Sequence, residues 1–241
     1  MNKVKVSAVS YTNTTPFIYG IKNTALLNEI DLSLDIPSTC AQKLIDNQVD
    51  LGLVPVAALL NIPGYEIISD YCIGATGAVT SVFIFSNKPV NEIKTLRLDL
   101  QSRTSNNLAR VLLKNYWKQS VELVESSDAD AFVEIGDRTF GKKASYPYVY
   151  DMGEEWMNFT GLPFAFAVWA ANKPLPEPFI QLFNESMKFG LDNRDKVIEE
   201  LPKRSDFDIS VYLKHSIDFA LTDKKREAIK LFHQYINALD S

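Results

Sequence analysis

The side chains that could do chemistry in this chain are mainly hydroxyls and amides that gather at turns. They occur at three places, Ser10–Thr15, Thr76–Ser81 and Ser102–Ser105. Where such a turn opens a helix, its free backbone N–H groups and hydroxyls suit the carboxylates of a small anionic ligand. Arg103, in the third turn, adds a guanidinium that can hold a carboxylate through two parallel hydrogen bonds. The pattern therefore indicates a binding site for a small anion.

Each of these turns also has a purely structural interpretation. Ser102 or Thr104 can serve only as a helix N-cap, because serine and threonine are common there. Tyr11–Thr15 can be an ordinary strand-to-helix turn, with the following proline at the first helical position. Arg103 can pair with a surface carboxylate, and Ser81 can belong to a tight turn. Taken singly, no motif decides a function.

Metal, nucleotide and nucleophilic chemistry find little support. The only histidines are His215 and His233, and neither has a cysteine or carboxylate at metal-ligand spacing. A Ser–His or Cys–His pair is equally hard to build, and no turn carries a glycine-rich phosphate-binding spacing. Cys40 and Cys72 do not indicate a disulfide framework. We therefore expect no metal and no cofactor.

Composition and charge are typical of a soluble globular protein. Of the 241 residues 46% are hydrophobic and 23% are charged, and the formal net charge is -5. There is no basic cluster of the kind that binds nucleic acid. The longest apolar runs, Leu51–Leu60 and Leu162–Ala171, are too short to span a bilayer. No secretory-type apolar stretch opens the chain, so we expect a cytoplasmic protein without a nucleic-acid or membrane partner.

Strand and helix patterns alternate along the chain, which predicts an α/β fold with a largely parallel sheet. The expected strands are Lys3–Ser10, Leu32–Ile36, Asp50–Val56, Ser81–Ser86, Thr95–Leu100, Asp130–Ile135, Pro147–Asp151 and Leu162–Ala171. The expected helices include Ser38–Asn47 with Ser38 as N-cap, one that opens at the Ser102–Ser105 turn, Met152–Phe159 and Lys224–Leu239.

A break in the middle of the chain suggests two lobes. Segments near 87–97 and 166–174 have the character of two crossings between a discontinuous first lobe and an inserted second lobe. We therefore expect lobe I over residues 1–88 and 172–241 and lobe II over residues 89–171. Two lobes joined by two crossings leave a cleft between them, which is the default place for a ligand.

Taken together, five segments resemble the menaquinone-biosynthesis family of the futalosine route, whose members dehydrate chorismate. The segments are Val9–Phe17, Gly77–Val82, Asp99–Ser105, Ile135–Asp137 and Asp151–Trp169. They follow the family's order and spacing over most of residues 1–170, and the Ser-Arg-Thr-Ser motif and the last segment are the most specific. The resemblance implies a two-lobed type II periplasmic-binding-protein fold with mixed sheets and a ligand cleft between the lobes.

The resemblance also implies that chorismate loses water to give 3-[(1-carboxyvinyl)oxy]benzoate without a cofactor. Asn13 and Ser81 match the family's catalytic positions: Asn13 would position or polarise the reacting centre, and Ser81 would hydrogen-bond the substrate. Because an amide is a poor proton acceptor at neutral pH, the substrate's own enolpyruvyl carboxylate is the expected base. The remaining expected contacts hold a carboxylate or wall the cleft; they are Tyr11, Thr76, Ser102, Arg103, Thr104, Ser105, Gly161, Leu162 and Pro163.

Three residues depart from the family pattern and leave the details of substrate choice open. Thr12 and Phe17 replace the usual residues of the opening motif, and Glu134 occupies a strand position that is normally apolar. Two alternative functions also remain. One is a 1,4-dihydroxy-6-naphthoate synthase of the same route, which shares the fold. The other is a solute-binding or sensory protein that closes on a small anion without chemistry.

Overall fold

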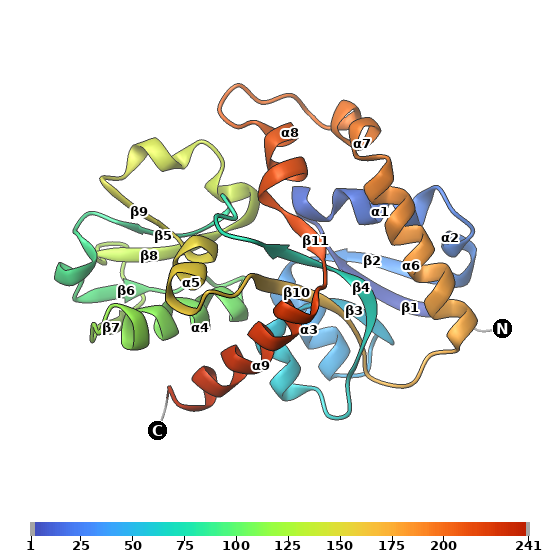
Figure 1. The fold of residues 1–241 in the computed structure, drawn as a ribbon, viewed down its shortest axis with the longest axis horizontal. Coiled ribbons are helices and arrows are strands. Elements are labelled where there is room, and N and C mark those ends of the chain that lie inside the picture. The colour runs from blue at the N-terminus through green and yellow to red at the C-terminus, as the bar shows by residue number, and fades with distance from the viewer. Residues whose placement is uncertain (1–2, 240–241) are drawn as a thin grey trace.

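Two β-sheets organise the structure, a computed structural model that describes residues 3–239. The strands are β1 (Val4–Val9), β2 (Ile30–Asp35), β3 (Leu51–Pro55), β4 (Glu66–Ala75), β5 (Val82–Ser86), β6 (Thr95–Arg97), β7 (Glu122–Val124), β8 (Ala131–Ile135), β9 (Tyr148–Asp151), β10 (Phe164–Ala171) and β11 (Asp218–Ala220). The first sheet has the order β11-β4-β10-β3-β1-β2 and the second the order β7-β6-β8-β5-β9. Figure 1 shows the two sheets side by side, with the second on the left.

Both sheets mix parallel and antiparallel neighbours. Strand β1 runs parallel to β2 and β3, whereas β10 is antiparallel to β3 and β4. In the second sheet β6 is parallel to β7 and β8, and β5 is antiparallel to β8 and β9. The expected α/β class with mixed sheets is therefore confirmed. The expectation of a largely parallel sheet is wrong, because in each sheet the strand that arrives from the other sheet, β10 or β5, runs antiparallel to its neighbours.

Helices and short helical turns surround the sheets. The α-helices are α1 (Thr15–Lys22), α2 (Leu26–Glu29), α3 (Pro37–Ile45), α4 (Arg103–Val111), α5 (Met152–Thr160), α6 (Glu177–Asp192), α7 (Arg194–Glu200), α8 (Ile209–Val211) and α9 (Asp223–Asn237). Four shorter turns matter for the site: η1 (Thr12–Thr14), η2 (Val56–Asn61), η5 (Gly136–Thr139) and the π-helical turn η7 (Tyr212–Ser216). In Figure 1, α4 and α5 lie with the second sheet, and α1, α2 and α6 lie with the first.

The predicted elements are largely confirmed, but helix α3 begins elsewhere than expected, and strands β4, β7 and β11 were not predicted. Helix α3 begins at Pro37 and not after Ser38; its N-cap is Ile36, which makes no side-chain cap hydrogen bond. A proline suits the first turn because the N–H that it lacks has no partner there. Strand β4 was missed, since the polar pair Ser69 and Asp70 interrupts its apolar pattern. The Asn184 side chain of α6 accepts hydrogen bonds from the Ser69 hydroxyl and the Asp70 N–H, at 2.8 and 3.0 Å.

The sheets place the two crossings elsewhere than the expected boundaries at 88/89 and 171/172. The chain leaves the first sheet after β4 and enters the second at β5, so residues 76–81 form the first crossing. It returns between α5 and β10, over residues 161–163. Strand β10 belongs to the first sheet because it pairs with β3 and β4, a long-range choice that its sequence pattern does not encode. Ser81 therefore lies in the first crossing, between β4 and β5.

A very close crossing of α1 and α6 sets the position of the N-terminal turn. A Cβ atom at Gly20 would lie 2.0 Å from the Ser186 carbonyl oxygen, and one at Gly190 would lie 1.8 Å from the Pro16 carbonyl oxygen. Both obstructing atoms belong to the backbone, so only glycine permits this approach. Because α1 continues directly from η1, the crossing also positions Asn13.

Candidate functional site

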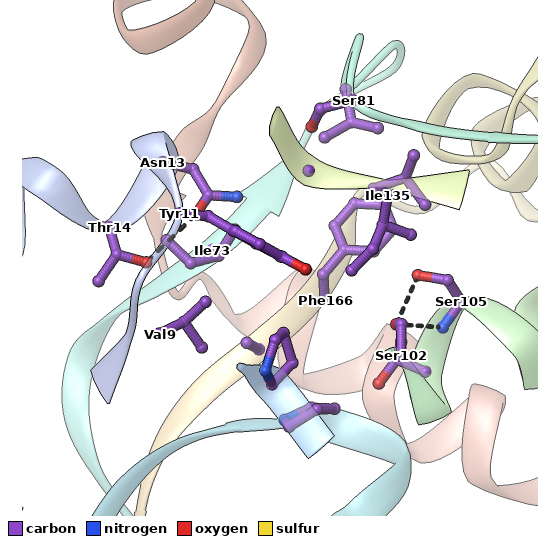
Figure 2. A pocket seen from close by; sticks show the side chains of 17 residues that line it. Val9, Tyr11, Asn13, Thr14, Ile73, Ser81, Ser102, Ser105, Ile135 and Phe166 are labelled. Atoms are coloured by element: carbon purple, nitrogen blue, oxygen red, sulfur yellow. Dashed lines mark hydrogen bonds between the residues drawn. The ribbon is translucent and has the colours of Figure 1, made fainter. Parts of the chain in front are cut away.

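A cavity of about 50 Å³ lies between the two sheets and is lined by residues of both (Figure 2). Its polar lining contains six of the predicted site residues, namely Tyr11, Asn13, Ser81, Ser102, Thr104 and Ser105. Apolar walls come from residues such as Ile73, Ile135 and Phe166. Pockets for small molecules usually measure about 300–1,000 Å³. The cavity in this conformation is therefore smaller than a typical small-molecule pocket.

Ser81 is held at one side of this cavity by backbone hydrogen bonds. The Asp151 carboxylate accepts hydrogen bonds from the N–H groups of Val79 and Thr80, at 3.0 and 2.7 Å. The Ser81 carbonyl accepts one from the Gly136 N–H at 2.8 Å. Thr80 has a φ of +60°, which is strained for a β-branched residue. Asp151 thus stabilises a strained turn that fixes the buried Ser81 hydroxyl at the cavity.

Asn13 approaches the cavity from η1. The Thr14 hydroxyl donates a hydrogen bond of 3.2 Å to the Asn13 side-chain oxygen. Figure 2 shows the amide nitrogen of Asn13 on the side that faces the cavity, away from Thr14. Asn13 therefore presents an N–H donor, and not a proton acceptor, to a ligand in the cavity.

The N-terminus of α4 forms the opposite side of the cavity. Ser102 is the N-cap of this helix: its hydroxyl accepts a hydrogen bond from the Ser105 N–H at 3.1 Å and donates one to the Ser105 hydroxyl at 2.9 Å. The Thr104 hydroxyl accepts a hydrogen bond from the Ala57 N–H at 3.1 Å, across to η2. The N-cap interpretation of Ser102 is confirmed. The partial positive charge of a helix N-terminus also suits an anionic group in the cavity.

Tyr11 crosses the cavity between Asn13 and the α4 turn, as Figure 2 shows. Its ring packs on the backbone of Gly136, where a Cβ atom would lie 2.8 Å from the ring. Its hydroxyl donates a hydrogen bond to the Gln101 side-chain oxygen. Burial raises the pKa of Tyr11, while the charge of Arg138 and a hydrogen bond with it oppose that rise. Arg138 in turn donates to the Asp99 carboxylate at 2.7 Å. Sequence reasoning assigned no role to Gln101, which lies within the Asp99–Ser105 segment, or to Arg138, which directly follows Ile135–Asp137.

Five other predicted contacts lie outside the cavity lining in the described part of the chain; they are Thr76, Arg103, Gly161, Leu162 and Pro163. The Arg103 guanidinium donates to the Gln42 side-chain oxygen at 2.9 Å. The Thr76 hydroxyl donates to the Asp218 carboxylate at 2.8 Å. Gly161 ends α5 in a left-handed conformation with a φ of +72°. A contact between any of these residues and a ligand requires a conformation other than this one, and it stays a prediction.

The three departures from the family pattern acquire structural roles. Thr12 donates hydrogen bonds to the Asp137 carboxylate from both its N–H, at 3.0 Å, and its hydroxyl, at 2.9 Å. This contact joins η1 to η5 across the two lobes. Glu134 on β8 pairs with Lys142 at 2.8 Å, which stabilises a carboxylate at an otherwise apolar strand. Phe17 is fully buried in the core.

A tyrosine from the C-terminal part of the chain also reaches the site. The Tyr212 hydroxyl donates a hydrogen bond of 2.8 Å to the Ser81 hydroxyl. No local signal marked Tyr212, because the C-terminal segments carry little signature of their own and Ser81 is 131 residues away in sequence.

The described residues contain neither a metal-ligand cluster nor a membrane-spanning helix. Within residues 3–239, no group of three or more His, Cys, Asp or Glu side chains could hold a metal ion. Over the same range, no helix has both the length and the apolar character needed to cross a membrane.

Solved structures similar to this one share a common architecture. An Archaeoglobus fulgidus protein has a TM-score of 0.75 at 16% identity, over 98% of this chain and 97% of that one. A Candida albicans protein with the periplasmic-binding-protein fold has a TM-score of 0.64 at 12% identity, over 99% and 94%. The alkanesulfonate-binding protein SsuA of Xanthomonas axonopodis has a TM-score of 0.62 at 13% identity, over 99% and 93%. The chain therefore has the periplasmic-binding-protein fold.

Sequence comparison identifies the family. The chorismate dehydratase of Thermus thermophilus is 27% identical over 195 residues, which cover 70% of this chain and 72% of that protein. The profile of the menaquinone-biosynthesis family matches residues 4–238, nearly the whole chain. The chain belongs to the menaquinone-biosynthesis family.

Proposed function

We propose that this protein dehydrates chorismate to 3-[(1-carboxyvinyl)oxy]benzoate. The observation that carries the proposal is the cavity between the sheets, where Asn13 and Ser81 face the same space as the N-terminus of α4. The similarity to the Thermus thermophilus chorismate dehydratase supports the choice of substrate. Periplasmic-binding-protein folds carry many functions. The cavity and the family therefore support the proposed function, whereas the fold alone does not.

The reaction removes a hydrogen from the ring carbon that bears the enolpyruvyl ether and a hydroxyl from its neighbour. The ring becomes aromatic, so the substrate itself supplies a large driving force. The protein then has to hold the C–H and C–OH bonds in a reactive orientation and assist the proton transfers. Such a task suits a small closed cavity whose polar groups are fixed by neighbouring hydrogen bonds.

In this proposal Asn13 and Ser81 are the two catalytic residues. Among the described residues, the cavity lining offers hydroxyls and one amide, none of which accepts a proton readily at neutral pH. The enolpyruvyl carboxylate of the substrate would therefore take the ring proton. The C–H electron pair would form the new ring double bond as the neighbouring C–O bond breaks, and the carboxylic acid would return the proton to the departing hydroxyl, which leaves as water. Asn13 would donate a hydrogen bond that polarises the reacting centre, and Ser81 would donate one to a substrate oxygen.

The α4 turn would bind a substrate carboxylate. Ser102, Thr104 and Ser105 are buried, and they place hydroxyls beside the positive end of a nine-residue helix. Tyr11 would lie along the ring, because its own ring crosses the cavity between this turn and Asn13.

The test is to incubate metal-free protein with chorismate and to follow the products by liquid chromatography and mass spectrometry. We expect a product that is lighter by one water and aromatic in its absorbance. Asn13→Ala should lose turnover and Ser81→Ala should keep only a low residual rate, yet both should stay folded by circular dichroism. The matched controls Asn28→Ala and Ser127→Ala replace exposed residues of the same types and should keep full activity.

Unchanged chorismate would overturn the proposal. Turnover of the substrate of 1,4-dihydroxy-6-naphthoate synthase would then identify that enzyme instead. Tight binding of chorismate without any product would identify a protein that binds the anion and does no chemistry. Full activity of Asn13→Ala would refute the role of Asn13 alone.

A further inference from the structure

We propose that Tyr212 is a positioning residue that orients the Ser81 hydroxyl toward the reacting ring. This inference rests on the proposed function and extends it to a residue that no motif of the chain indicates. Tyr212 comes from η7, at the far end of the chain, and approaches the cavity from behind Ser81.

A buried hydrogen bond joins Tyr212 to the catalytic Ser81. The Tyr212 side chain is 1% exposed, and its hydroxyl donates to the Ser81 hydroxyl at 2.8 Å. Burial raises the pKa of Tyr212 far above its ordinary value, and the hydrogen bond with Ser81 only partly opposes this. Tyr212 is therefore a neutral hydroxyl at neutral pH.

The direction of these hydrogen bonds leaves two donors free for a ligand. Because the Ser81 oxygen accepts the Tyr212 proton, the proton of Ser81 itself points elsewhere, and the cavity is the space that Ser81 lines. The Thr14 hydroxyl occupies the side-chain oxygen of Asn13, which leaves the amide N–H groups of Asn13 for the cavity. The hydrogen bond from Tyr212 also polarises the Ser81 hydroxyl, which makes Ser81 a better donor.

The ring of Tyr212 is held independently of its hydroxyl. It packs edge-on against Phe140 and Phe207, with centroids 5.3 Å away in both cases. These two rings stack on each other, and Phe140 follows η5 of the other lobe. Tyr212 also opens a π-turn, closed by a hydrogen bond from the Ile217 N–H to the Tyr212 carbonyl at 3.0 Å. Such turns are frequent at functional sites. Tyr212→Phe therefore removes the hydroxyl and keeps the packing.

If Tyr212 had only a structural role, its hydroxyl would satisfy a buried hydrogen bond without affecting the chemistry. Steady-state kinetics with chorismate distinguishes this structural role from a positioning role. We expect Tyr212→Phe to lower kcat about tenfold, the effect of one neutral hydrogen bond, with KM unchanged. The matched control is Tyr150→Phe, which removes a hydroxyl that accepts a hydrogen bond from the Val90 N–H at the edge strand β9 of the second sheet. It should leave kcat unchanged. A wild-type kcat in Tyr212→Phe would overturn the proposal.

A double-mutant cycle tests whether Tyr212 acts through Ser81. In the Ser81→Ala background, adding Tyr212→Phe should lower the residual rate by less than it does in the wild-type background, because its partner is already absent. Fully additive losses would overturn the proposed coupling.

Crystal structures of the wild type and Tyr212→Phe test the positioning without any turnover. We expect the Ser81 hydroxyl to leave its wild-type rotamer in the variant. If the Ser81 rotamer is unchanged, the proposal is wrong. If the wild-type protein does not convert chorismate, the proposed function fails, and the Ser81 rotamer alone decides the role of Tyr212.

Discussion

The close crossing of α1 and α6 makes Gly190→Ala the most informative stability variant. The new methyl group would lie 1.8 Å from the Pro16 carbonyl oxygen and 2.9 Å from the Gly20 nitrogen. These are backbone atoms, so no side chain can turn away to relieve the contact. The helices must separate by about 1.5 Å before the methyl group reaches an ordinary van der Waals distance.

The magnitude follows from two opposing effects. Overpacking typically costs about 1–3 kcal/mol, and a backbone obstruction belongs at the upper end of that range. Alanine recovers up to about 1 kcal/mol, because it is a better helix former than glycine. We therefore expect a net loss of about 2 kcal/mol in the free energy of unfolding, which for a chain of this length lowers Tm by roughly 4–8 °C.

Thermal denaturation followed by circular dichroism measures this loss directly. The control Glu185→Ala changes an exposed position on the same helix and should stay within about 0.5 kcal/mol of the wild type. Since α1 continues from η1, displacement of α1 should also move Asn13 and slow chorismate turnover at temperatures where the variant is folded. An unchanged Tm together with wild-type turnover would refute the argument from the crossing.

Two further variants test the contacts around the site. Burial raises the pKa of Asp218, but hydrogen bonds from Lys225 and Thr76 lower it more, so this pKa lies below its ordinary value. A carboxylate with a depressed pKa stabilises the fold at pH values above the ordinary aspartate range. This stabilisation is lost as the pH falls through the folded-state pKa. Asp218→Asn should therefore lower Tm at pH 7, and the difference from wild type should shrink below about pH 4; a difference independent of pH would contradict the ion pair. Ser102→Asp should keep the N-cap of α4 and hence Tm, but should raise the KM for chorismate by placing a negative charge beside its carboxylate. A KM like that of the wild type would show that this turn does not bind the anion.

Local sequence patterns were sufficient for most elements and for the turns that carry polar groups. Strand β1, helix α5 and helix α9 all lie within about two residues of their expected bounds, since alternation and helical spacing report which face of an element is buried. The N-cap role of Ser102 was also readable, because the cap hydrogen bond joins residues only three positions apart.

Resemblance to a family carried the prediction further than the patterns did. It implied the fold, and it selected Asn13 and Ser81, which the structure brings to one cavity from different parts of the chain. It also selected Thr76 and Arg103. Their side chains donate hydrogen bonds to Asp218 and Gln42 and do not line that cavity. A motif records which residue types stand at a position, but the direction of a side chain depends on the neighbours that tertiary packing provides.

Only the tertiary structure decided how the strands are shared between the sheets and what lies behind the site. Strand β10 has an apolar pattern that either sheet could bury, and its pairing with β3 and β4 depends on residues about 90–120 positions earlier in the chain. Gly190 gives no sign in sequence that its partner is the carbonyl of Pro16. Tyr212 likewise meets Ser81 only because η7 packs beside the first crossing. Periodicity reports burial along one element, whereas these contacts depend on the free energy of the whole fold.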